Sequence, residues 1–168
     1  MYKYEKAKYS ANTIAKEVIS YSNEKDFSIS NLKLQKVLYF IQAIFLNEYH
    51  RACFSDDIEA WAFGPVVPSV YRQYKIFGAN SIPTTVFNKN NFASIFALTS
   101  YETNEIISKD DINIIHNIVN ELSSYTASEL VEITHSQSPW INAYMPRLNN
   151  IISNDSILEY FSSTNAED

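Results

Sequence analysis

The residues that could carry out catalysis or bind a metal are few in this sequence and far apart. The histidines are His50, His116 and His135, and the only cysteine is Cys53. They lack the His-x-x-x-His and Cys-x-x-Cys spacings that bring two metal ligands to one surface, so we expect no metal site. Cys53 and His135 could act as nucleophile and base, but no flanking signature supports that pair. A lone, partly buried thiol is the commoner alternative.

One acidic cluster could serve acid–base chemistry. It consists of Asp56, Asp57 and Glu59, and the alternative is a turn with one structural carboxylate. Gly64 and Gly78 are the only glycines, which excludes P-loop and dinucleotide-binding motifs because those loops need several glycines. No hydrolase, transferase or nuclease motif is present, so we expect a protein that is not an enzyme and needs no cofactor.

The charge distribution argues against autonomous binding to nucleic acid. The net charge is −6, with 10 − 8 = +2 in residues 1–84 and 3 − 11 = −8 in residues 85–168, whereas DNA binding requires a clustered basic surface. The acidic half is expected to form solvated helix faces, with a contact surface for a basic partner as the alternative. We expect Lys33 and Lys36 to lie at a solvated rim and not on phosphate groups.

Neither a secretory signal nor a membrane span is expected. Residues 1–9 are charged and run into a polar stretch without an apolar region. The longest apolar stretch, residues 37–46, is about half the roughly 20 residues that a bilayer requires. We therefore expect a cytoplasmic protein that does not contact a membrane.

Apolar periodicity and capping residues predict a mainly α-helical chain. They predict a first helix capped by Ser10 and a central helix over about residues 31–50 capped by Ser30. Pro68 suits the first position of a further helix, and Gly78 its left-handed end. Later helices are predicted after Ser108 and Thr126, with capping boxes completed by Asp111 and Glu129, then a short turn at 138–140 and a last helix at about 154–162.

The segments between the helices are expected to be partly extended. Residues 58–63 alternate as a short extended segment, and Gly64-Pro65-Val66-Val67-Pro68 forms an elbow that is not helical. Residues 82–87 and 92–98 are predicted as two short strands joined by a polar turn. The fold class is therefore mainly α, a compact single-domain helical fold with a short extended segment or a small β-hairpin between helices. No repeat or linker indicates a second domain.

Four aromatic residues could form a binding hot spot, since tryptophan and tyrosine dominate interface energetics. They are Tyr39, Trp61, Tyr71 and Trp140. Core packing is the alternative, and we favour it because their spacing is what packing produces.

Three stretches of this sequence together resemble one family. They are Leu32-Lys-Leu-Gln-Lys-Val-Leu-Tyr-Phe40, Ile58-Glu-Ala-Trp-Ala-Phe-Gly-Pro-Val-Val-Pro-Ser-Val-Tyr71 and Leu130-Val-Glu-Ile-Thr-His-Ser-Gln-Ser-Pro-Trp140. In residues, order and separation they resemble the Panacea domain of SocA-like and GepA-like antitoxins, over about residues 10–145. The sequence departs from the family pattern at Val37, Ala62, Phe63 and Ala52-Cys53, and the loss of charge at Ala62 could alter a surface contact.

The resemblance implies a helical antitoxin that binds a cognate protein toxin encoded by a neighbouring gene. It leaves two alternatives open, which are a proteolytic adaptor that delivers the toxin to an AAA+ protease and a transcriptional co-regulator of its own operon. The residues it marks as family-motif and possible toxin-binding positions are Gln35, Lys36, Tyr39, Glu59, Trp61, Phe63, Gly64, Pro65, Tyr71, Thr134, His135, Pro139 and Trp140.

Two hypotheses follow for the toxin contact. In the first, the two prolines make the elbow rigid, so that it presents Trp61, Phe63 and Tyr71 in a set geometry at little entropic cost. In the second, which we favour slightly, the elbow only turns the chain, and the toxin contacts residues 82–107 and the acidic C-terminal half.

Overall fold

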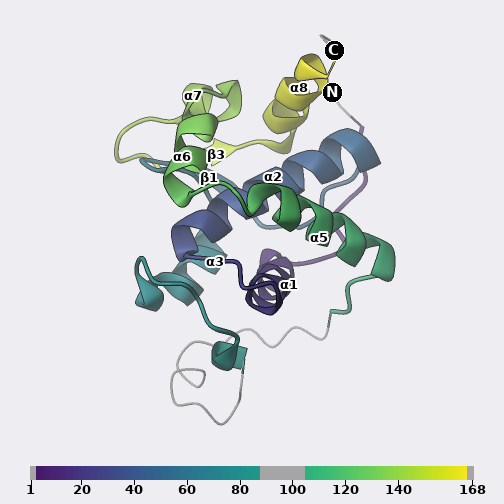
Figure 1. Cartoon of the computed structure of the whole chain (residues 1–168). Helices are drawn as coiled ribbons and strands as arrows, with labels where there is room; N and C mark the ends of the chain where they lie inside the picture. Colours follow the sequence, from purple (N-terminus) through teal and green to yellow (C-terminus); the bar gives the residue numbers. More distant parts are fainter. Residues whose placement is uncertain (1–2, 88–104, 166–168) are drawn as a thin grey trace.

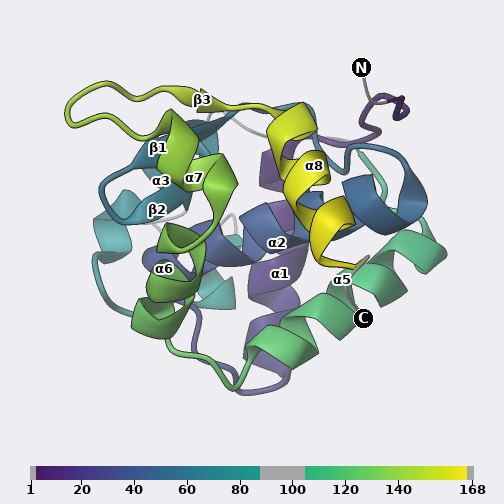
Figure 2. The same ribbon diagram turned by 90° about the horizontal axis from the view of Figure 1, so that it is seen from above.

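The computed structural model describes residues 3–87 and 105–165, which form helices packed around one central helix. That helix, α2 (Asn31–Tyr49), lies in the middle of both ribbon views (Figure 1, Figure 2). The prediction of a mainly α fold is confirmed. The other helices are α1 (Ala11–Glu24), α3 (Pro68–Tyr74), α5 (Lys109–Leu122), α6 (Ala127–His135), α7 (Ser138–Ala143) and α8 (Asn154–Thr164).

α2 is central because its middle, residues 37–41, is apolar on every side. It packs against α1, α3, α5, α6, α8 and the small sheet, and a helix that is hydrophobic all round is stable only when it is covered on all faces. Its fully buried side chains include Leu34, Leu38, Ile41 and Phe45. Among the helices in the described residues, none has the length and apolar character needed to cross a bilayer.

The predicted helix starts are largely confirmed by the capping bonds. The Ser10 and Ser30 side chains accept hydrogen bonds from the backbone N–H groups of Thr13 and Lys33. Thr126 and Glu129 form both bonds of a capping box at the start of α6, and Pro68 is the first residue of α3. These bonds satisfy N–H groups that have no partner inside the helix.

The capping box predicted for α5 is only half formed. The Ser108 side chain accepts from the backbone N–H of Asp111, as expected. The Asp111 carboxylate, however, accepts from the Tyr9 hydroxyl and pairs with Arg51, while the backbone N–H of Ser108 donates to the Tyr9 hydroxyl oxygen. A partly buried arginine offers a carboxylate a stronger, charge-assisted bond than a backbone amide does, so the ion pair prevails.

A small antiparallel sheet covers one end of α2. β1 (Ile58–Trp61) lies in the segment that was predicted to be extended, and it forms a hairpin with β2 (Gly64–Val66) of the predicted elbow, with Trp61 opposite Gly64. β3 (Ile151–Ile152) pairs with the other side of β1, so the strand order is β2-β1-β3. A strand of two residues carries no periodic signal, which is why the sequence did not predict β3.

The strand predicted at residues 82–87 is wrong. Residues Thr84–Phe87 form a short 3₁₀ helix, with the backbone N–H of Val86 donating to the Pro83 carbonyl at 3.3 Å. Pro83 favours this turn because its ring fixes φ near the helical value. Only Ile82 of this segment bonds to another segment through its backbone N–H, which donates to the Ile29 carbonyl oxygen at 2.9 Å. The companion strand predicted at 92–98 lies outside the described residues.

Candidate functional site

The three sequence motifs meet at one place, which we call the motif junction. There the first half of α2 contacts β2 and α6, and α6 contacts β2 and α7. Figure 2 shows all of these elements gathered at the same end of α2. The motif junction is formed by the residues Gln35, Lys36, Tyr39, Trp61, Gly64, Pro65, Thr134, His135 and Trp140.

Lys36 is fully buried at the centre of the motif junction, with an exposed fraction of 0 %. Its Nζ donates a hydrogen bond to the Pro65 carbonyl oxygen at 2.9 Å. Within the described part of the chain, no carboxylate lies at ion-pair distance from this amine. Burial lowers the pKa of Lys36 from 10.5 to about 7, because a low-dielectric surrounding disfavours the charged form.

The expectation that Lys33 and Lys36 are solvated rim residues is therefore wrong. Lys33 is also buried, and its Nζ donates to the Ser123 carbonyl at 3.2 Å. Both side chains lie inside because α2 has neighbours on every face, so its polar side is covered as well. The ends of the two lysines reach backbone carbonyls, which partly compensate for the lost hydration.

Gly64 brings the hairpin into close contact with Lys36. Its φ is +100°, a conformation that side chains with a Cβ rarely adopt. A Cβ on Gly64 would lie 2.6 Å from Lys36 Cε and 2.8 Å from Thr134 Oγ1. The Thr134 hydroxyl is held in place by donating to the Val131 carbonyl at 2.9 Å. The glycine of the family signature thus permits both the turn and the contact between all three motifs.

Two further α2 side chains hold the motif junction together. The Gln35 Oε1 accepts from the backbone N–H of Val67 at 2.9 Å, at the point where the elbow enters α3. The Tyr39 hydroxyl donates to Gln137 Oε1 at 2.8 Å, which ties α2 to the start of α7. Both α2 residues are buried. Their hydrogen bonds satisfy polar atoms that would otherwise be costly to bury.

Trp140 connects α7 to the hairpin. Its indole N–H donates to the Trp61 carbonyl oxygen at 2.8 Å. The Trp140 ring is stacked between His135 and Tyr144, with centroid distances of 4.0 Å and 4.6 Å. Trp61 in turn packs edge-on against Tyr71 at 4.9 Å and donates its own indole N–H to Glu59 Oε2 at 2.7 Å. These rings position the hairpin turn relative to α7.

The surroundings of His135 lower the pKa of its imidazole. Burial lowers its pKa, the hydrogen bond with the Ala62 backbone opposes this, and the charge of Lys36 lowers it further. Its Nε2 is buried and meets no hydrogen-bond partner in the described part of the chain. His135 therefore stacks on Trp140 at a place where the charged form of the imidazole is disfavoured.

The other groups considered for chemistry are used elsewhere in the fold. Cys53 is fully and not partly buried, and burial raises the pKa of its thiol. Asp56 accepts from the backbone N–H of Ala11 at 2.8 Å and from the Ser69 hydroxyl at 2.7 Å, a structural role. His116 stacks on Tyr21 and contacts Glu17 at 2.7 Å. No group of three metal-binding side chains gathers within residues 3–87 and 105–165.

The remaining predicted site residues differ in exposure. Pro139 is buried, whereas Glu59, Trp61 and Tyr71 are half-buried. Phe63 stands apart, because it is 68 % exposed at the turn between β1 and β2. Gln137 and Tyr144 complete the motif junction and were not predicted. Gln137 lies between the histidine and the proline-tryptophan pair of the third motif, and this position inside the motif is the signal that points to it.

Comparisons with known proteins give two matches. Residues 34–141, more than half of the chain, match the family model described as "Antitoxin SocA-like, Panacea domain". The chain is also 31 % identical over 131 residues to the protein named Antitoxin SocA of Caulobacter vibrioides (strain NA1000 / CB15N), an alignment that covers 77 % of this chain and 68 % of that protein. No solved structure matches significantly.

Proposed function

The chain belongs to the SocA-like antitoxin family with a Panacea domain, and from this premise we propose that it neutralises its toxin by binding it directly. Membership in this family implies a toxin as the partner. Neutralisation by binding needs no chemistry, only a complex that covers or distorts the working surface of the toxin. We propose that the protein acts in this way in the cytoplasm, without turnover and without autonomous binding to nucleic acid.

One observation carries the proposal. The family motifs are used to build a buried junction, and the exception is Phe63, which this junction leaves 68 % exposed on the hairpin turn. Gln35, Lys36, Tyr39 and Thr134 are buried and engaged with backbone or with other motif residues. A rigid scaffold that presents a turn to solvent suits recognition of a partner, because little conformational entropy is lost on binding.

The structure supports a combination of the two hypotheses for the elbow. Its prolines and Gly64 turn the chain into α3 against Lys36, which is a structural role. Trp61 and Tyr71 are half-buried against each other, so only Phe63 offers a largely free side chain to a partner. Most of residues 82–107 lie outside the described residues, and a toxin contact in that segment stays a prediction.

Co-expression tests the proposed function. The adjacent open reading frame is expressed alone and together with this protein, and the two purified proteins are then mixed and analysed by size-exclusion chromatography. We expect growth arrest with the neighbour alone, normal growth with both genes, and a stable complex from the purified pair. A toxic neighbour that is neutralised without forming a complex would overturn direct binding, and a neighbour that is harmless would overturn the antitoxin function.

The choice of host strain distinguishes delivery to a protease from direct inhibition. If the protein delivers its toxin to an AAA+ protease, neutralisation must fail in strains that lack such proteases, and the toxin must accumulate when degradation is blocked. Direct inhibition predicts unchanged rescue and unchanged toxin levels in the same strains. A shift of the operon's promoter DNA by the protein alone would favour a transcriptional role, against which the net charge of −6 argues.

A further inference from the structure

A set of exposed apolar side chains lies directly outside the motif junction. The apolar surface, as we define it, consists of Phe63, Ile141, Met145, Leu148 and Ile151. Each is between 52 % and 68 % exposed, and together they are five of the nine large hydrophobic side chains that stand exposed within the described residues. Single exposed hydrophobic residues are ordinary on a monomer, but a gathering at one place is typical of an interaction site.

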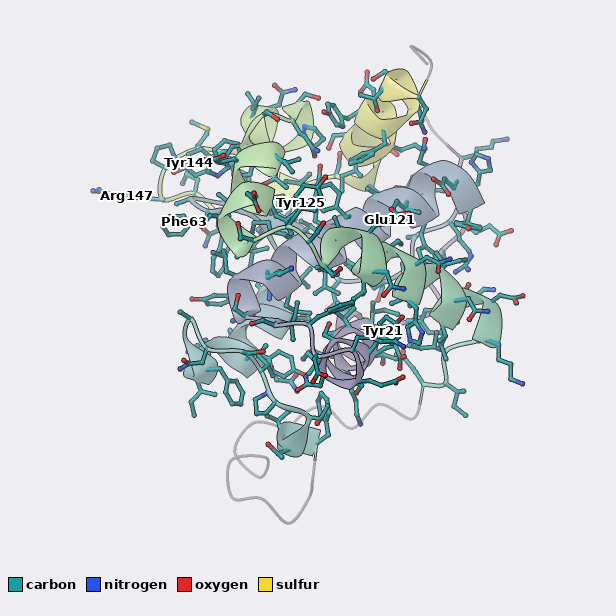
Figure 3. All side chains as sticks on the ribbon, viewed as in Figure 1. Tyr21, Phe63, Glu121, Tyr125, Tyr144 and Arg147 are labelled. Carbon is teal, nitrogen blue, oxygen red and sulfur yellow. The ribbon has the colours of Figure 1, made fainter. Side chains whose placement is uncertain are left out.

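These five side chains come from elements that the motif junction holds together. Phe63 follows Trp61, whose carbonyl accepts the indole N–H of Trp140 in α7. Ile141 is in α7, Met145 and Leu148 are in the loop after it, and Ile151 is in β3, which α7 contacts. Figure 3 shows Phe63, Tyr144 and Arg147, which mark the turn and this loop, along the same edge of the molecule.

The loop between α7 and β3 is held by its own hydrogen bonds. The backbone N–H of Leu148 donates to the Met145 carbonyl at 3.1 Å, and the Asn150 side chain donates to the Ala143 carbonyl at 2.9 Å. Asn150 also bonds through its carbonyl to the backbone N–H of Ala60 in β1 at 2.8 Å. Arg147 has a left-handed backbone with φ of 68°. The exposed apolar residues are therefore presented in a fixed arrangement, which lowers the entropic cost of docking.

Charge distinguishes this surface from the rest of the C-terminal half. Residues 85–168 sum to −8, yet residues 136–154 contain a single charged residue, Arg147. Charged residues are depleted at the centre of protein interfaces, while arginine and large apolar residues are enriched there. We propose that the apolar surface is the docking site for the cognate toxin, and that the toxin presents an apolar patch with a carboxylate opposite Arg147.

The same charge argument favours the toxin over a second copy of this chain. In a two-fold symmetric dimer, the same patch is used on both partners. Such a dimer would bring two copies of Arg147 into one apolar interface, and no carboxylate from residues 136–154 could pair with them. Like charges placed together in an interface are costly. A different protein can supply the missing carboxylate.

The inference rests on the proposed function, and a binding experiment separates the two. The purified product of the adjacent toxin gene is titrated with wild-type protein and with the variants Met145→Glu and Leu148→Glu. We expect the dissociation constant to rise about 30-fold or more for each, as for residues central to an interface. The matched control is Ile76→Glu, which adds the same charge at an apolar residue that is 70 % exposed just after the end of α3, and it should bind within about twofold of wild type.

A second pair of variants tests whether the toxin places a carboxylate opposite Arg147. Arg147→Glu should weaken toxin binding about tenfold with a loss of salt dependence, and Arg147→Lys should restore most of the affinity, since it keeps the charge. If a variant in the loop after α7 fails to fold, Phe63→Ser replaces it, because Phe63 belongs to the same apolar surface but lies in the hairpin turn. Toxin binding by this variant is measured in the same way.

Three outcomes overturn the inference. If wild-type protein binds the toxin and the folded surface variants bind equally well, the toxin docks elsewhere, although the proposed function stands. If wild-type protein is a dimer in sedimentation and the surface variants are monomers, a second copy covers the surface. If wild-type protein does not bind the toxin at all, the proposed function fails and the docking site fails with it.

Discussion

The motif junction and the apolar surface are adjacent, yet the residues of the first are mostly buried and those of the second are exposed. In the motif junction, Lys36 and Gln35 are covered and bonded to the backbone of the elbow. On the apolar surface, Phe63 and Met145 are more than half exposed. Most residues that make the family recognisable therefore stabilise the fold, whereas the residues that we expect to touch the toxin lie outside the motifs, with Phe63 as the exception.

The strongest way to break the motif junction is Gly64→Ala. We expect it to lower the free energy of unfolding by about 3 kcal/mol, because the new Cβ meets Lys36 and Thr134 and φ of +100° is strained for alanine. Chemical denaturation measures the change. Gly78→Ala is the matched control: Gly78 also has a positive φ, of +55°, but open space around it, so a loss of about 1–2 kcal/mol from backbone strain alone is expected. Equal losses for both would show that the contact with Lys36 has no energetic consequence.

Because the amine of Lys36 is buried, the free energy of unfolding should depend on pH. Its pKa is lowered from 10.5 to about 7 in the folded protein, so the unfolded state binds more protons between pH 7 and 10, and stability must rise with pH in that window. Lys36→Met removes this dependence. Between pH 7 and 9, the stability of wild type relative to Lys36→Met should increase by about 2 kcal/mol. Urea denaturation of both proteins at each pH measures the difference, and a constant difference would mean that Lys36 is not desolvated.

Trp140→Phe tests the link between the motif junction and the apolar surface. It keeps an aromatic ring between His135 and Tyr144 but removes the N–H that donates to the Trp61 carbonyl. We expect a loss of about 1.5 kcal/mol in unfolding free energy. Tyr144→Phe, which keeps the stack and removes only a hydroxyl, should cost less than about 0.5 kcal/mol. A larger loss for Tyr144→Phe than for Trp140→Phe would place the important link elsewhere.

The smallest effects on stability are expected on the apolar surface. Met145→Glu, Leu148→Glu and Phe63→Ser replace side chains that are more than half exposed. Their unfolding free energies should stay within about 0.5 kcal/mol of wild type, as for exposed positions in general. Thermal and chemical unfolding measure this. Losses as large as that of Gly64→Ala would show that the surface belongs to the core, and the contrast between the two regions would disappear.

The sequence predicted most of the fold because its signals are local. The caps at Ser10, Ser30 and Thr126 and the proline at the start of α3 were read correctly from neighbouring residues. The failures involve distant partners. Asp111 gives up its capping bond for Arg51, which lies 60 positions away in the chain. A local pattern cannot show such a competitor.

The sequence identified many of the residues of the motif junction but not how they are arranged in space. The motifs identified Lys36, Gly64, Thr134 and Trp140, yet the position of Lys36 was predicted wrongly. Helical periodicity marks a polar face, and only the packing of the hairpin and α6 onto that face shows that it is covered. Apart from Phe63, the apolar surface had no motif to mark it, because exposure of Ile141 or Leu148 depends on the tertiary structure and not on spacing.

Hydrogen exchange with and without the toxin shows which surface of the protein the toxin covers. The purified protein is labelled alone and in complex with the product of the adjacent toxin gene, and protection is compared peptide by peptide. We predict that the complex slows exchange at residues 61–63 and 141–151, while the already buried amides of α2 change little. Protection confined to α1, α5 or the segment at 82–107, with no change at 141–151, would contradict it.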